Sequence, residues 1–99
     1  MKHQTVVGEV FRLIGNHLKS KGHPCRSFIA PTDVVLADDQ VVQPDVILVC
    51  DETKVRDNAI VGVPDVVIEV LSASTEKKDR GKKMKLYRRS GKKRILFIL

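Results

Sequence analysis

Residues 64–72, "PDVVIEVLS", form an apolar run with one acid inside it. A continuous run of β-branched and aliphatic residues is typical of a strand that is covered on both faces, as in the sheet of an α/β protein. An ionised carboxylate without a partner is costly in such a strand. Glu69 must therefore lie at an exposed edge, be paired, or serve a function. Residues 43–50, "QPDVILVC", open with the same Pro-Asp-Val but carry no glutamate.

The other segments of the chain alternate between helical and strand-like patterns. Apolar residues at helical spacing predict a helix over 2–21 that Gly22 ends. A second helix is predicted over about 74–90, where Ser74 or Thr75 can cap its start. Residues 51–59 are interpreted as a polar loop. The predicted strands are 26–30, 33–37, 45–50, 65–71 and 94–99.

This order of elements predicts an α/β fold with a mixed sheet flanked by helices. The strand at 65–71 reaches the last strand through a helix, so that pair should be parallel with a right-handed crossover. The chain has 99 residues, which is enough for one small domain over 1–99. No apolar run approaches the length of a membrane span and the first residues do not resemble a signal peptide, so we expect a cytoplasmic protein with no membrane partner.

Cysteines and histidines give no pattern of a metal site. Cys25 and Cys50 each lie in or beside an apolar run without a C-x-x-C spacing, and we expect both to be buried free thiols. His3, His17 and His23 lie in or next to the first predicted helix, and we interpret them as ordinary surface histidines.

Basic residues gather near the end of the chain. The net charge is +6, and residues 77–94 hold 11 of the 18 Lys and Arg residues. Such a segment attracts phosphate backbones, but a solvated helix face has the same composition, and both interpretations stay open. The candidate nucleic-acid-binding residues are Lys77, Lys78, Arg80, Lys82, Lys85, Arg88 and Arg89.

Two acids can converge if the strands at 45–50 and 65–71 are neighbours. Side chains alternate across a strand, so Asp65 and Glu69 share one face, and Asp45 stands where the earlier strand begins. Two convergent carboxylates repel each other, and a divalent cation relieves that repulsion. Oxygen ligands favour magnesium or manganese. An aspartate after a proline also commonly closes a turn, which is the alternative for Asp45 and Asp65.

The second predicted helix can add a cation to this pair. Asp79, Lys83 and Tyr87 recur at i, i+4 and i+8 and so lie along one stripe, which can hold Lys83 over the carboxylates. In a helix this rich in lysine, an isolated Lys83 is typical of an ordinary surface lysine. Tyr87 by itself is typical of a packing residue with its hydroxyl at the rim.

Three runs, "APTDVVL", "QPDVILVCDE" and "PDVVIEVLSASTEKKDRGKKMKLYRRSG", closely resemble the Uma-type (DUF820-like) family of restriction-endonuclease-like proteins, within the PD-(D/E)XK nuclease superfamily. The resemblance implies a core of a helix, three or four strands, a helix and a strand. It implies that Asp45 is the motif aspartate and Glu69 the acid of the second motif. The lysine expected two residues later is Leu71 here, and Lys83 would replace it from the following helix.

The resemblance further implies a magnesium-dependent or manganese-dependent endonuclease that hydrolyses phosphodiester bonds of DNA. Asp45, Glu69 and the Val70 carbonyl would hold the metal, and Asp65, Asp79 and Tyr87 would support the site. Two other classes remain open. The chain can be a degenerate nuclease fold that binds nucleic acid without cleaving it, which Leu71 favours, or a structural interaction domain whose last strand pairs with a partner.

The resemblance also predicts a shortened family member with weak or absent activity. Relatives continue through further strands after "YRRSG" and carry a hairpin before the first helix, and neither feature is recognisable in this chain. An uncovered apolar sheet edge tends to pair with another copy, so we expect a homo-oligomer.

Overall fold

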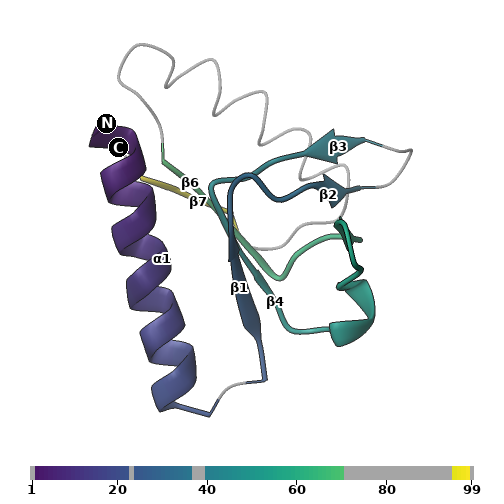
Figure 1. Ribbon diagram of the computed structural model, residues 1–99, viewed down its shortest axis with the longest axis horizontal. Coiled ribbons are helices and arrows are strands. Elements are labelled where there is room, and N and C mark those ends of the chain that lie inside the picture. The colour runs from purple at the N-terminus through teal and green to yellow at the C-terminus, as the bar shows by residue number, and fades with distance from the viewer. Residues whose placement is uncertain (1, 23, 37–39, 71–94, 99) are drawn as a thin grey trace.

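The computed structural model describes residues 2–22, 24–36, 40–70 and 95–98 (Figure 1). The predicted second helix, 74–90, lies outside these residues. The described elements are α1 (Lys2–Ser20), β1 (Arg26–Ile29), β2 (Val34–Val35), β3 (Val41–Val42), β4 (Val46–Val49), the 3-10 helix η2 (Glu52–Lys54), β5 (Ile60–Val61), β6 (Val66–Val70) and β7 (Ile95–Ile98).

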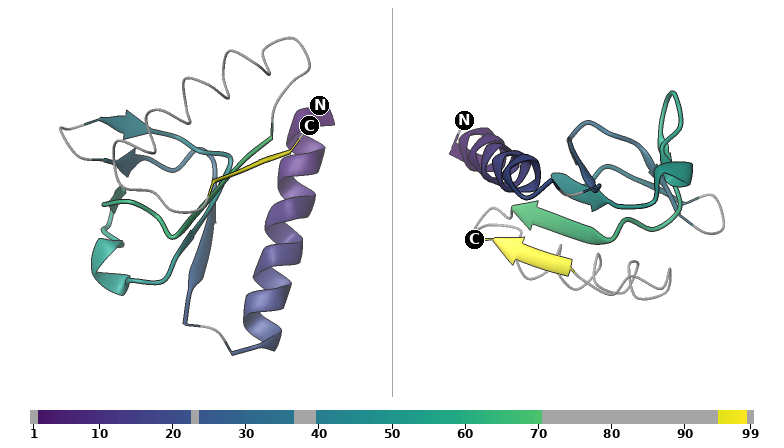
Figure 2. Two further views of the ribbon diagram at one scale, coloured as in Figure 1. Left: turned by 180° about the vertical axis from the view of Figure 1, so that it is seen from behind. Right: turned by 90° about the horizontal axis from the view of Figure 1, so that it is seen from below.

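A mixed four-stranded sheet forms the centre of the fold, with the strand order β1-β4-β6-β7. β4 pairs antiparallel with both β1 and β6, whereas β6 and β7 are parallel. The right-hand view of Figure 2 shows β6 and β7 running in the same direction. The α/β class, the mixed sheet and the parallel last pair are therefore confirmed.

Helix α1 covers one face of this sheet and carries the apolar stripe that its sequence predicts. Val7 is buried against Val46, Ile68 and Val70 of the sheet. Further residues at helical spacing pack around this cluster, namely Val10, Phe11 and Ile14. Gly22 takes a positive φ of 62° just after the helix, the conformation in which glycine commonly ends a helix. Within the part of the chain that the structure describes, no helix has both the length and the apolar character needed to cross a bilayer.

The opposite face of the sheet packs against a second, smaller sheet of order β3-β2-β5. Figure 1 shows β2 and β3 on the side of the molecule away from α1. The core between the two sheets contains Val34, Leu36, Ile47, Val49, Ile60 and Val67. Val67 and Ile68 thus belong to different cores, as the alternation of side chains along a strand requires.

Two predictions about this region were wrong. The segment 33–37 was expected in the main sheet, but β2 pairs antiparallel with β3 and parallel with β5 instead. The segment 51–59 was expected to be loop, yet it contains η2, where the Asp51 side chain accepts the Thr53 N–H at the start of the helix. Each strand of the small sheet has only two residues, which is too short for a periodic pattern to appear in the sequence.

The prediction of free cysteines was also wrong, because Cys25 and Cys50 form a disulfide. Arg26 and Val49 form the last pair of the antiparallel β1–β4 ladder. The next residue outward on each strand is a cysteine, so Cys25 and Cys50 face each other. The pairing of β1 with β4 brings together two sulfurs that are 25 residues apart in the sequence. The residues around each cysteine contain no motif that predicts this disulfide.

Candidate active site

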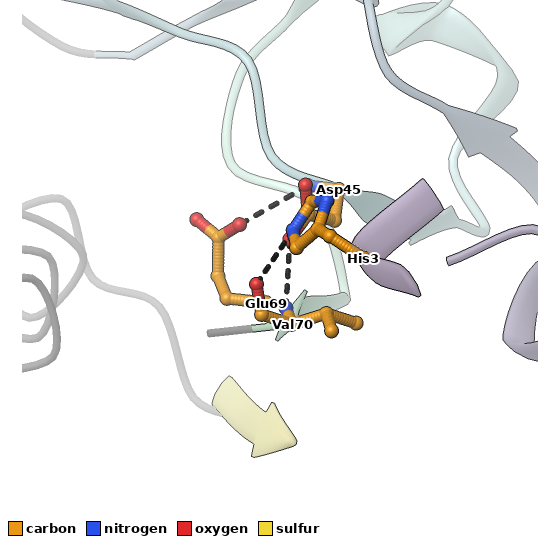
Figure 3. Close-up of polar contacts among 4 residues, drawn as sticks. All are labelled: His3, Asp45, Glu69 and Val70. Atoms are coloured by element: carbon orange, nitrogen blue, oxygen red, sulfur yellow. Dashed lines mark hydrogen bonds and ion pairs between the residues drawn. The ribbon is translucent and has the colours of Figure 1, made fainter. Parts of the chain in front are cut away.

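Asp45 and Glu69 lie opposite each other at one end of the β4–β6 pair. The register pairs Val46 with Ile68, and one step further brings Asp45 across from Glu69. The Asp45 backbone N–H donates to Glu69 Oε1 at 3.1 Å (Figure 3). Glu69 is almost fully buried, with 1% of its surface exposed, and the Asp45 side chain is 16% exposed. The two strands are neighbours, and their acids meet as the sequence predicts.

Val70 turns both of its backbone polar groups toward this end of β4. Its N–H donates to Asp45 Oδ2 at 2.7 Å. Continuing the register places Val70 across from Pro44, which has no N–H to give to a sheet ladder. The Val70 carbonyl is therefore open to a partner other than the β4 backbone at this point. Pro44, in the first Pro-Asp-Val, thus ends the hydrogen-bond ladder between β4 and β6 next to Asp45 and Glu69.

His3 provides that partner from the first turn of α1. Its Nε2 lies 2.7 Å from the Val70 carbonyl oxygen and 3.4 Å from Asp45 Oδ2 (Figure 3). His3 is exposed, as the sequence predicts, but the sequence analysis does not foresee its contacts with Val70 and Asp45. One signal could have revealed them: His3 precedes buried Val7 by four residues, so it lies on the face of α1 that packs on the sheet.

Asp65 lies at the other end of β6, away from this pair. Its Oδ2 accepts the Cys50 N–H at 2.7 Å, and its own N–H donates to the Leu48 carbonyl. Because β4 and β6 are antiparallel, the two Pro-Asp-Val openings stand at opposite ends of the strand pair. The structure therefore does not bring Asp65 together with Asp45 and Glu69. In this position its carboxylate accepts a hydrogen bond from the backbone N–H of Cys50, the residue directly after β4.

The remaining predicted site residues lie outside the described part of the chain. They are Asp79, Lys83 and Tyr87 and the basic residues Lys77, Lys78, Arg80, Lys82, Lys85, Arg88 and Arg89.

The donor atoms at the Asp45–Glu69 pair suit a hard divalent cation. Two carboxylates and the Val70 carbonyl offer oxygen, which magnesium and manganese prefer. Among residues 2–22, 24–36, 40–70 and 95–98, no three His, Cys, Asp or Glu side chains are already arranged to hold a metal ion. Each acid instead accepts a backbone N–H, Asp45 from Val70 and Glu69 from Asp45. The residues present fit the chemistry of such an ion.

A pocket of about 300 Å³ opens beside the pair, and its lining includes His3, Gln4, Pro31 and Asp45. Small ligands commonly bind in concave sites of this size that carry a few convergent polar groups. Asp45 and His3 are therefore accessible from a defined hollow.

A helix-covered mixed sheet with an acid pair at the end of two central strands defines a restriction-endonuclease-like domain. The family model described as "Uma2: Putative restriction endonuclease" matches residues 1–98. The chain belongs to the Uma2 family, which confirms the resemblance seen in its motifs.

A solved structure supports the same fold. The chain is similar to the crystal structure of a protein described as a putative nuclease belonging to DUF820, from Anabaena variabilis ATCC 29413, with a TM-score of 0.73 and 19% sequence identity. The similarity covers 98% of this chain and 57% of that one, so this chain spans little more than half the length of that protein. A comparison with curated proteins gave no match.

Proposed function

We propose that this chain is a metal-dependent nuclease that hydrolyses phosphodiester bonds of DNA at Asp45 and Glu69. One observation carries the proposal: the two acids lie opposite each other on β4 and β6, and the Val70 backbone meets them at the same point. Membership of the Uma2 family and the nuclease-like fold support the reaction class.

Asp45, Glu69 and the Val70 carbonyl would hold one magnesium or manganese ion. When bound, the ion lowers the pKa of a water molecule and stabilises the charge that gathers on the phosphate. The chain contributes rigidity to this arrangement. The Val70 N–H orients Asp45 Oδ2, and the Asp45 N–H orients Glu69 Oε1, so both acids are fixed by strand backbone.

Lys83 and the basic segment would act on the substrate. In this proposal the Lys83 ammonium stabilises the phosphate charge, in place of the lysine that the motif would have at Leu71. The basic residues of 77–94 bind the phosphate backbone of the duplex, largely without regard to sequence.

Plasmid cleavage and calorimetry together test the acid pair. Asp45→Asn and Glu69→Gln should abolish magnesium-dependent or manganese-dependent cleavage and weaken metal binding, because each replaces a charged ligand by a neutral one of the same shape. Glu52→Gln, at an exposed acid outside the pair, is the matched control and should leave both unchanged. Metal affinity that is the same in Glu69→Gln as in the unmodified chain would remove the carboxylate site.

Single substitutions in the basic segment test the lysine. In the helix that the sequence predicts over 74–90, Lys83 would share a stripe with Asp79 and Tyr87, whereas Lys82 and Lys85 would not. Lys83→Ala should therefore lower cleavage with binding retained, and Lys82→Ala and Lys85→Ala should not lower cleavage in this way. Equal loss of cleavage in Lys82→Ala and Lys83→Ala at unchanged binding would contradict this role. Equal loss of binding in all three variants would instead indicate a phosphate-contacting patch.

Leu71 favours a second candidate function, which is DNA binding without cleavage. A fluorescent duplex titrated over a salt series, with and without magnesium, separates the two. Cleavage supports the nuclease, and binding that weakens with salt in the absence of any cleavage supports the binding module. The absence of both would contradict the two proposals together.

A further inference from the structure

A second pocket, of about 350 Å³, lies beside the core between the two sheets, since Phe28, Val55 and Ile60 of that core belong to its lining. The other lining residues are mostly polar and include Thr32, Asp33, Gln43, Arg56, Asp57 and Asn58. Ligand sites commonly combine an apolar wall with a few convergent polar groups in this way. The pocket is therefore a candidate ligand site that is separate from the acid pair.

Hydrogen bonds hold the polar groups of this pocket in place. The Gln43 side-chain amide donates to Asp33 Oδ1 at 2.7 Å. The Arg56 backbone N–H donates to the Ala59 carbonyl at 2.9 Å and closes the turn between them, and Arg56 Nε donates to the Thr53 carbonyl at 3.1 Å. A ligand therefore meets groups that are already oriented, which lowers the entropic cost of binding.

The charges of the lining favour a neutral ligand. Asp33 and Asp57 stand against one cation, Arg56, so the lining carries a net negative charge that would repel a phosphate. A neutral ring suits the pocket if its edge carries both donors and acceptors, because Arg56 and Asn58 donate and the two carboxylates accept. Nucleobases have such edges, and their faces pack against aromatic and apolar side chains.

The pocket also lies next to the proposed site of cleavage. Pro31 lines both this pocket and the pocket of about 300 Å³ beside Asp45. The Ala30 N–H donates to the Asp45 carbonyl at 3.0 Å, which holds the segment that leads into Pro31 against β4. Gln43 of the lining precedes Asp45 by two residues. A strand with a phosphate at Asp45 can therefore reach the second pocket across Pro31.

We propose that the pocket lined by Arg56 and Asn58 binds one unpaired base of the DNA strand that the acid pair cuts. This inference rests on the proposed function and adds a substrate preference, namely DNA with a single-stranded, bulged or mismatched base next to the cleaved bond. A base must leave its stack to enter a pocket, and the cost is least for a base that is already unpaired.

Fluorescence anisotropy with two metal-free DNA duplexes tests the preference. One duplex carries a single bulged thymine, and the other carries an abasic site in the same bulge. The unmodified chain should bind the first about tenfold more tightly, on the scale of one stacked base. Both duplexes carry the same phosphates, so the ratio of the two affinities is independent of the general attraction between basic residues and the backbone.

Substitutions test whether this pocket holds the base. Asn58→Ala and Arg56→Ala should each reduce the ratio of the two affinities toward one, because each removes a donor from the lining. Asn16→Ala, at an exposed asparagine of α1, is the matched control and should retain the tenfold ratio. Circular dichroism of the variants checks that the helix and sheets are retained.

Photo-cross-linking locates the base without any variant. A 5-iodouracil in the bulged position should cross-link to Phe28 or to residues 55–60, as sequenced by mass spectrometry. This measurement uses the unmodified chain, so it stands even if a substitution disturbs folding.

The outcomes separate this inference from the proposed function. Equal affinity of the unmodified chain for the two duplexes, with plasmid cleavage still lost in Glu69→Gln, would overturn the base pocket and leave the proposed function intact. A tenfold ratio that both Asn58→Ala and Arg56→Ala retain, or cross-links confined to residues outside the pocket, would also overturn it. A base preference that depends on Asn58, together with cleavage unaffected by Glu69→Gln, would support the pocket and contradict the proposed function.

Discussion

The main chain of Asp45 holds the side chain of Glu69, since the Asp45 N–H donates to Glu69 Oε1 at 3.1 Å. A second hydrogen bond runs in the opposite direction between the strands: the N–H of Val70, the residue after Glu69, donates to Asp45 Oδ2 at 2.7 Å. Both carboxylates therefore complete the hydrogen bonding of strand backbone at the end of the β4–β6 pair. The residues proposed for chemistry are also part of what keeps these two strands together.

Asp45→Ala should destabilise the metal-free protein more than Asp45→Asn. Alanine leaves the Val70 N–H without its acceptor, which costs about 1–3 kcal/mol when the group is shielded from water. Asparagine keeps a carbonyl oxygen in the same place and should retain most of the stability. Urea unfolding of the two variants measures the difference. Equal free energies of unfolding would show that the Val70 bond contributes little.

Gly62→Ala should destabilise the fold by about 1–3 kcal/mol, because Gly62 has a positive φ of 116°, which other residues rarely adopt. An added Cβ would also lie 3.2 Å from Cδ of Lys54, whose ammonium donates to the Val63 carbonyl. Thermal unfolding measures the loss.

Gly8→Ala is the opposite case and serves as the control for Gly62→Ala. Gly8 lies inside α1, and a Cβ there would meet nothing within 4 Å. Alanine in a helix should raise the free energy of unfolding by about 0.5–1 kcal/mol relative to glycine. If both variants lose stability, the difference in backbone conformation between Gly62 and Gly8 does not determine the effect of alanine on the free energy of unfolding.

Reduction of the Cys25–Cys50 disulfide should lower the free energy of unfolding by about 3.5 kcal/mol, as expected for a bridge that closes a loop of this length. Urea unfolding with and without a reductant measures the effect, and Cys25→Ala/Cys50→Ala is the control that a reductant should not affect. Thiol labelling should find no reactive cysteine before reduction. Two labelled thiols in the untreated protein would contradict the bridge.

Two hydrogen bonds from Thr53, first from its hydroxyl and then from its backbone N–H, hold the pKa of the Asp51 carboxyl below its ordinary value. A carboxyl with a lowered pKa in the folded state stabilises the fold above its unfolded pKa and loses that contribution as the pH falls through the folded pKa. Thr53→Val removes the hydroxyl and should raise the pKa of Asp51, whereas Thr53→Ser should not. Titration followed by nuclear magnetic resonance measures both, and identical titration curves would contradict the assignment.

Much of the main sheet and the acid pair could be predicted because their signals are local. Helical spacing gave α1, and apolar runs gave β1, β4, β6 and β7. Asp45 and Glu69 could be paired in advance because each stands at a fixed position in a strand, and neighbouring strands then bring them together. The position of a residue within a helix or strand fixes the face on which its side chain lies.

The features that were missed depend on contacts between distant parts of the chain. His3 meets Val70 across 67 residues, and the disulfide joins residues that only the β1–β4 pairing brings together. The small sheet consists of two-residue strands that exist only because they pair with one another. None of these contacts leaves a repeating pattern in a short window of sequence.

The register of β4 and β6 also gives Glu69 a part in the fidelity of folding. A slip of one residue would turn the side chains of β6 to the other face, and Glu69 would then enter the apolar cluster beneath α1. Burying a carboxylate among valines and isoleucines is far more costly than misplacing another valine. In a strand otherwise made of interchangeable apolar residues, this one acid disfavours every pairing that is out of step by one.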